Sequence, residues 1–146
     1  MIFCPGNHEL FGKQLKRIGI DDANYCVHFD NALVIVLTVQ YKVFIETANI
    51  SQQRANDAMS YLRKALDENQ GVQHVFVAVH VCPFLSDKGL LPTNQHYAET
   101  FLNIIETHPN IRAVFSGHDH LFSAFKVGNC YLKMTGPGGK WHTSYK

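Results

Sequence analysis

The stretch that decides the fold of this chain is HVFVAVHV, at residues 74–81. It is a continuous apolar run, interrupted only by histidines, and it ends immediately before Cys82-Pro83. Runs of this kind are typical of strands that are covered on both faces, as in a parallel sheet between helices. We therefore predict a buried strand over Val72–Val81, with His80 at its carboxyl end.

Helix signals lie on both sides of this strand. Before it, apolar residues recur at helical spacing from Ser51 to about Asn69, with Ser51 as a candidate N-cap and Gly71 as the stop. After it, Asn94–His108 carries a second apolar face and ends at Pro109-Asn110. Alternation of strands and helices is typical of α/β proteins.

Shorter strand signals complete the alternation. Ile111–Phe115 reads as another buried strand, and hairpin turns are expected at Asp30-Asn31 and Gly128-Asn129. The remaining candidate strands are Ile2–Cys4, Asn24–Phe29, Leu33–Thr38, Lys42–Ile45, Leu121–Val127 and Tyr131–Thr135. We predict a layered α/β fold with a mixed sheet. A chain of 146 residues suits one domain, spanning residues 1–146.

Composition and charge exclude several classes of function. The formal net charge is +1 and there is no long Lys/Arg cluster, so the sequence offers no electrostatic case for binding nucleic acid or an anionic membrane surface. The longest apolar runs are far too short to span a bilayer. The four cysteines are widely separated and form no Cys-x-x-Cys pair, which predicts reduced thiols rather than a disulfide framework.

Metal-capable side chains follow three of the predicted strands. Gly6-Asn7-His8-Glu9 comes after Ile2–Cys4, and His80 ends the central strand. Gly117-His118-Asp119-His120 follows Ile111–Phe115. If the three strands are parallel, these loops open at the same edge of the sheet, where α/β proteins bind their ligands. Imidazole nitrogen and amide oxygen together suit zinc, iron, manganese or similar divalent ions.

The spacing of His118 and His120 fits such a site. In extended backbone, side chains two residues apart point to the same side, with Cβ atoms about 6.5–7 Å apart. That separation can serve one metal, or two metals about 3.5–4 Å apart, and Gly117 frees the backbone to turn. Each motif alone also fits a polar turn or a core histidine, and only the three together favour a site.

These motifs resemble those of the calcineurin-like metallophosphoesterases. GNHE at 6–9, VAVH at 77–80 and GHDH at 117–120 stand in the order of that family's later motifs, and FDNALVIVLT resembles its middle strands. The resemblance covers residues 2 to about 136. It implies a β-sandwich flanked by helices, and an enzyme that hydrolyses phosphate mono- or diesters by in-line attack of a metal-bound hydroxide.

The resemblance also implies a role for each site residue. Asn7, His80 and His118 would ligate one divalent ion, and His120 would ligate a second. His8 would be catalytic, protonating the leaving alkoxide. The ions would be of manganese, iron, zinc or magnesium type, with two in the complete family site.

The sequence departs from the family pattern in one major respect. The family's first two motifs, Asp-x-His and Gly-Asp-x-x-Asp, precede GNHE and supply two ligands of the first metal and a bridging carboxylate, and this chain contains neither. It therefore resembles the C-terminal part of the domain, lacking the N-terminal strands. Two dications without that carboxylate repel each other, so we expect impaired turnover. The alternative is a non-catalytic remnant that binds a partner or a single weak metal.

Two further expectations concern surfaces. A sheet that lacks strands leaves an open edge, where we expect association with something that covers it. The histidines outside the motifs are expected on the surface or at helix caps. His96 is the exception, because the loop before it could bring it near the substrate.

Overall fold

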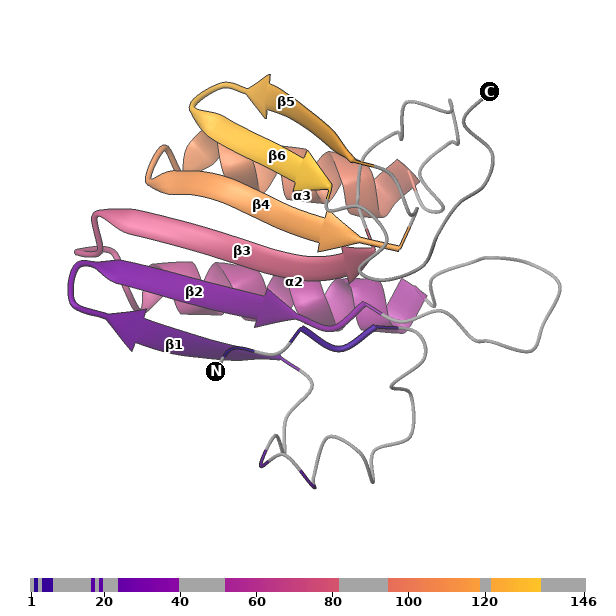
Figure 1. Ribbon diagram of the computed structural model, residues 1–146, viewed down its shortest axis with the longest axis horizontal. Helices are drawn as coiled ribbons and strands as arrows, with labels where there is room; N and C mark the ends of the chain where they lie inside the picture. Colours follow the sequence, from indigo (N-terminus) through magenta and orange to yellow (C-terminus); the bar gives the residue numbers. More distant parts are fainter. Residues whose placement is uncertain are drawn as a thin grey trace, which may run out of the picture.

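Six strands form one mixed sheet in the computed structural model (Figure 1). The structure describes residues 2, 4–6, 17, 19, 24–39, 52–81, 95–118 and 122–134. The strands are β1 (Tyr25–Phe29), β2 (Ala32–Leu37), β3 (His74–Val81), β4 (Ile111–Gly117), β5 (Ser123–Val127) and β6 (Cys130–Met134). The helices are α2 (Gln52–Asp67) and α3 (Gln95–Thr107).

The sheet is built around four parallel strands. The order across it is β1-β2-β3-β4-β6-β5. Strands β2, β3, β4 and β6 run parallel, whereas β1 and β5 pair antiparallel with β2 and β6. Helices α2 and α3 provide the crossovers that successive parallel strands need. The carboxyl ends of the four parallel strands therefore meet at one edge of the sheet (Figure 1).

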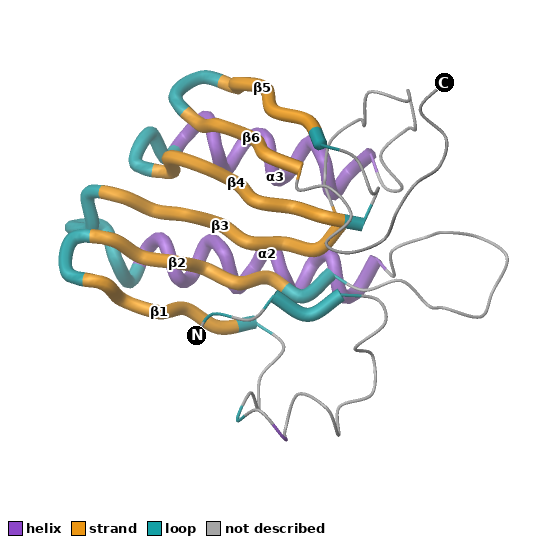
Figure 2. The backbone as a smooth tube through the Cα atoms, in the orientation of Figure 1, coloured by secondary structure: helices purple, strands orange, loops and turns teal. Residues whose placement is uncertain are grey.

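Both helices lie on the same face of the sheet (Figure 2). Their apolar sides and alternate residues of the strands form a single buried cluster, in which Leu62 of α2 and Phe101 of α3 are fully buried. The β3 members of the cluster are Val75, Val77, Val79 and Val81. Each fully buried aliphatic or aromatic side chain contributes about 1.5–3 kcal/mol. This layer therefore holds the strands and the helices together.

The opposite face of the sheet is only partly covered. Burial alternates along β3, so that Phe76, Ala78 and His80 are half-buried. Phe115, which pairs with Ala78, is 39% exposed, and Tyr131 of β6 is 52% exposed. The prediction that the central strand is covered on both faces is therefore wrong for the described residues, because both helices pack on one side.

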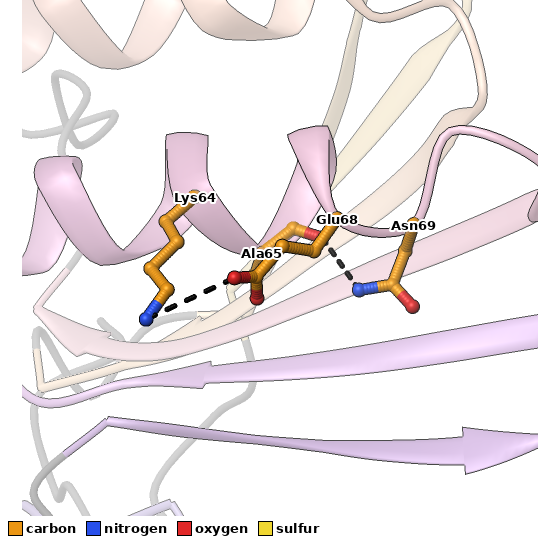
Figure 3. Close-up of polar contacts among 4 residues, drawn as sticks. All are labelled: Lys64, Ala65, Glu68 and Asn69. Atoms are coloured by element: carbon orange, nitrogen blue, oxygen red, sulfur yellow. Dashed lines mark hydrogen bonds and ion pairs between the residues drawn. The ribbon is translucent and has the colours of Figure 1, made fainter.

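Helix α2 ends close to the predicted stop. The helix runs to Asp67, and a turn follows through residues 68–71. The side-chain Nδ2 of Asn69 donates a hydrogen bond of 2.7 Å to the backbone oxygen of Ala65, satisfying a carbonyl of the last turn (Figure 3). Lys64 and Glu68 form an i, i+4 ion pair of 3.8 Å on the exposed side, a contact that contributes about 0.3–0.5 kcal/mol.

Both predicted hairpins are present. Strands β1 and β2 are joined at Asp30-Asn31, where Asp30 has a φ of 46°. Strands β5 and β6 are joined at Gly128-Asn129, where Gly128 has a φ of 55°. Positive φ in a tight turn favours Gly, Asn and Asp. The residues that predicted these turns are therefore suited to the backbone conformation found there.

Several strand predictions differ from the structure: β3 begins at His74 rather than Val72, and β5 begins at Ser123, after the described residue Phe122. Strand β4 continues beyond Phe115 to Gly117, because β3 runs alongside it as far as Val81. The expected strand over Ile2–Cys4 is absent at Ile2 and Cys4, the two described residues of that segment. The predicted features at Lys42–Ile45, Ser51 and Thr135 lie outside the described residues.

Within the described ranges, no helix is long and apolar enough to cross a membrane. Cys4, Cys26 and Cys130 are not joined in disulfides, and Cys82 lies outside the described residues. Burial raises the pKa of the Cys130 thiol to about 11, against a smaller lowering by the backbone hydrogen bond at Val114.

Candidate metal centre

His80 is delivered to the carboxyl edge of the sheet by β3. It is the second-to-last residue of the strand, and it is half-buried. Val79 and Val81 are both buried, so His80 between them faces away from the helices, and a shift in the β3–β4 register between Val79 and Val81 marks this point of the strand. The sequence pattern of the strand thus positions this side chain.

His118 follows β4 directly and occupies a left-handed backbone conformation. Its φ is 71°, a region that costs a non-glycine residue about 1–2 kcal/mol. The expectation of extended backbone at His118 is therefore wrong. The turn also occurs one residue later than expected, because Gly117 ends β4 without a positive φ. Backbone strain of this kind clusters at functional sites.

The two imidazoles face each other across β3 and β4. The Nδ1 atom of His118 lies 3.3 Å from the Nε2 atom of His80. The ring centroids are 5.2 Å apart and the ring planes meet at 80°. The register brings them together, because Val81 pairs with Gly117, each adjacent in sequence to one of the two histidines. One ring N–H can donate to the other nitrogen, or both lone pairs can serve one cation.

The separation of the two nitrogens fits a shared metal ion. Two nitrogens bound to zinc at about 2.0–2.1 Å with a tetrahedral angle lie about 3.3–3.4 Å apart, and the observed distance is 3.3 Å. The same bond length and angle put the two ring centres about 5.2 Å apart, in agreement with the observed centroid distance of 5.2 Å. The residues present therefore fit a divalent cation held between the two rings.

Gly117 sets the space beside the His80 ring. A Cβ atom at this position would lie 3.6 Å from Nδ1 of His80 and 3.9 Å from its backbone oxygen. These are ordinary van der Waals contacts, so a methyl group fits there. A larger side chain at Gly117 would press on the imidazole and turn it away from His118.

The other predicted site residues lie outside the described residues: Asn7, His8 and His120. Within the described part of the chain, no group of three or more His, Cys, Asp or Glu side chains could hold a metal. The structure thus brings together two of the predicted ligands, His80 and His118. The contribution of the other three residues stays a prediction.

A polar cavity lies on the helical side of the sheet, and it was not predicted from the sequence. The cavity has a volume of about 400 Å³ and lies between α2 and α3. It is lined by Ala55, Asn56, Met59, Ser60, Arg63, His96, Tyr97 and Thr100. The sequence does contain a pattern that could have predicted this cavity. Asn56, Ser60 and Arg63 are polar residues at i, i+4 and i+7 on α2, and residues with this spacing share one side of a helix.

Comparison with known proteins gives the family. The model of the calcineurin-like phosphoesterases matches residues 1–122. The chain belongs to the calcineurin-like phosphoesterase family. The match includes His80 and His118, the two described residues of the candidate metal centre. No curated protein matches this phosphoesterase chain significantly.

Solved structures support the same fold. One of them is a protein from Staphylococcus aureus described as a candidate 5'-nucleotidase, in complex with alpha-ketoglutarate. It is 19% identical to this phosphoesterase chain, with a TM-score of 0.50. The alignment covers 80% of this chain and 24% of that protein, so the chain spans about a quarter of its neighbour. The predicted metallophosphoesterase-like α/β fold is thereby confirmed.

Proposed function

We propose that residues 1–146 form the C-terminal portion of a single metal-dependent phosphoesterase domain, which hydrolyses phosphate mono- or diesters. Membership in the calcineurin-like phosphoesterase family supports the reaction class. The observation that carries the proposal is the 3.3 Å approach of His80 and His118 at the carboxyl edge of the parallel strands, the edge at which α/β folds bind ligands.

The proposed ligands form two groups. His80 and His118, with Asn7, hold one divalent ion of manganese, iron, zinc or magnesium type, and His120 belongs to a second. When bound, such ions polarise the phosphoryl oxygens and neutralise charge that develops on the phosphate. Among these ions, zinc and iron suit imidazole nitrogen best, and ligands placed on strand ends keep their geometry better than ligands on loops.

The described residues contribute preorganisation. The strand holds His80 in place, and Gly117 leaves its ring room to meet His118. His118 has a left-handed backbone, and its ring lies toward His80 of β3. The strained backbone thus accompanies the close approach of the two nitrogens, as is common at functional sites. A ligand pair that is already in position loses little further conformational entropy when it binds a cation.

His8 is the proposed proton donor. An alkoxide is a poor leaving group unless its oxygen is protonated as the P–O bond breaks, and a positioned imidazolium contributes about 10²–10⁴-fold to such a step. This role rests on the match of GNHE to the family motif, because His8 lies outside the described residues.

The alternative proposal is a non-catalytic module that binds one weak metal or a partner. The ligands named above are all neutral, and the described part of the chain brings only two metal-capable side chains together. Two dications held by neutral ligands repel each other. We therefore expect slow turnover by this chain, and binding of one metal before a second.

Hydrolysis of p-nitrophenyl phosphate and bis-p-nitrophenyl phosphate tests the proposal for mono- and diesters. We expect slow, manganese-dependent turnover that is lost in His80→Ala and in His8→Ala. The matched control is His28→Ala, at an exposed position of β1, which should leave turnover unchanged. Turnover that persists in EDTA would contradict the proposal. Manganese binding through His80 and His118 without turnover of either ester would favour the non-catalytic alternative.

A further inference from the structure

We propose that the cavity between α2 and α3, here called the helix groove, binds a small organic phosphate independently of the His80–His118 pair. The groove is the cavity of about 400 Å³ lined by Ala55, Asn56, Met59, Ser60, Arg63, His96, Tyr97 and Thr100. Sites for small molecules have volumes of about 300–1,000 Å³. The size of the groove therefore suits a ligand of mononucleotide dimensions.

The rim of the groove is rich in hydrogen-bond donors. Helix α2 contributes the side chains of Asn56, Ser60 and Arg63, and α3 contributes those of His96 and Thr100. Each of these side chains can donate at least one hydrogen bond, and the guanidinium alone has five N–H groups. No Asp or Glu is among the described residues that line the groove. Such a rim favours an anion with several acceptor oxygens, which describes a phosphate group.

Arg63 is available to hold that anion. It is exposed, and it makes no ion pair within the part of the chain that the structure describes. The next residue, Lys64, pairs with Glu68 at 3.8 Å and does not line the groove (Figure 3). Adjacent helix residues point about 100° apart, which follows from 3.6 residues per turn. A guanidinium without a carboxylate partner can bind phosphate through two parallel N–H···O bonds.

The floor of the groove is buried and largely apolar. Ala55, Met59 and Tyr97 are each at most 4% exposed. Tyr97 packs edge-on against Phe101, with ring centroids 6.1 Å apart. His96 and Tyr97 belong to the first turn of α3, where the helix dipole adds positive potential. A polar rim above an apolar floor fits an organic phosphate, with its anionic group at Arg63 and its body against the floor.

The groove and the metal centre lie on different sides of the sheet. Helices α2 and α3 cover one face (Figure 2). The buried Val79 and Val81 of β3 face these helices, so the half-buried His80 between them faces the other side. The two sites can therefore be tested separately. EDTA removes divalent ions and prevents phosphate binding through a metal at His80 and His118, but it leaves the donors of the groove in place.

Calorimetric titration of the chain with adenosine monophosphate in EDTA tests the proposal. Arg63→Gln removes the guanidinium, and Lys64→Gln is the matched control one residue away. A hydrogen bond to a charged group is strong enough that its loss weakens binding by about tenfold or more. We expect that loss in Arg63→Gln and unchanged affinity in Lys64→Gln. Orthophosphate should compete with the nucleotide, whereas adenosine should bind at least about tenfold more weakly.

Backbone amide shifts in EDTA provide the location. Adenosine monophosphate should shift the amides of residues 55–63 and 96–100 and leave those of residues 79–81 and 117–118 unchanged. Equal affinities in the Arg63 and Lys64 variants would overturn the proposal, as would tight binding of adenosine or the absence of saturation at millimolar nucleotide. Because the metal is absent throughout, none of these outcomes depends on phosphoesterase activity.

Discussion

The Nε2 atom of His80 and the Nδ1 atom of His118 lie 3.3 Å apart, although 38 positions separate the two residues in the sequence. Two features create this contact. The parallel register of β3 and β4 sets Val81 beside Gly117, and the left-handed backbone at His118 turns its ring toward β3. Each feature gives a prediction about a single substitution.

Two substitutions at His118 distinguish the effect of backbone strain on stability from the effect of the imidazole on metal binding. At a φ of 71°, glycine is unstrained, whereas alanine is strained like histidine and costs about 1 kcal/mol relative to glycine. His118→Gly should therefore be more stable than His118→Ala by about that amount, as measured by urea unfolding. Both variants should lose metal binding. A His118→Gly variant less stable than His118→Ala would contradict the left-handed assignment.

The space beside His80 limits the size of the side chain that residue 117 can carry without weakening metal binding. A Cβ at this position makes only ordinary contacts, at 3.6 Å from the imidazole. Where the backbone suits both residues, alanine loses less conformational entropy on folding than glycine, a gain of about 0.4–1 kcal/mol. Gly117→Ala should keep metal affinity and be as stable as the wild type or more so. Gly117→Leu should weaken metal binding. Similar metal affinity for Ala and Leu at this position would show that the ring is not confined here.

The Cys130 thiol gives a prediction in alkaline solution. Its pKa is raised from 9.0 to about 11 in the folded state, so the unfolded chain loses this proton first as the pH rises. The contribution of the thiol to stability is therefore constant below pH 9 and declines between about pH 9 and 11. The free energy of unfolding of the wild type should fall more steeply over that range than that of Cys130→Ala. Parallel curves for the two proteins would contradict the raised pKa.

The open face of the sheet predicts self-association of the chain. Phe115 and Tyr131 are 39% and 52% exposed on that face, and exposed apolar patches on sheets promote contacts between molecules. Light scattering should give a mass above that of the monomer, reduced in the double variant Phe115→Thr, Tyr131→Thr. His28→Thr, at an exposed polar position of β1, is the control. A monodisperse monomer at high concentration would refute this prediction.

Local signals predicted much of the fold. The apolar run at 74–81, the helical spacing of α2 and α3, and the turn residues at Asp30 and Gly128 each coincide with an element of the structure. Periodicity does not reveal which face of a strand is covered, because a run such as HVFVAVHV is apolar on both. The error at β3 arose there, since the half-exposed positions carry Phe76 and Ala78 rather than polar residues.

Two predicted site residues, His80 and His118, lie side by side in the structure, and the geometry of their contact was not predictable. The metal-capable side chains at His80 and His118 follow from their positions at strand ends. Their contact depends on the register between β3 and β4 and on a φ at His118 that histidine rarely adopts. Neither quantity is encoded in local propensity. The helix groove was not predicted for a related reason. In the sequence, Arg63 has the pattern of a solvent-exposed helix residue, and only the packing of α3 against α2 makes it part of a cavity.

Protons should compete with metal at the histidine pair. Ligand imidazoles must be neutral, and the ordinary pKa of histidine is about 6.5. Metal affinity should therefore be strong at pH 7.5 and fall at pH 5, in a titration followed by cobalt absorption. Retention of the metal at pH 5 would rule out histidine ligation.

The most direct test of the central claim is a cobalt(II) titration at pH 7.5 of four proteins: the wild type, His80→Ala, His118→Ala and the double variant. If one ion is shared by the two rings, each single substitution should weaken binding at least about tenfold, and the double variant should be little weaker than either single one, because the shared site is already lost. His28→Ala should bind like the wild type. Wild-type affinity in either single variant would contradict a metal site built on His80 and His118.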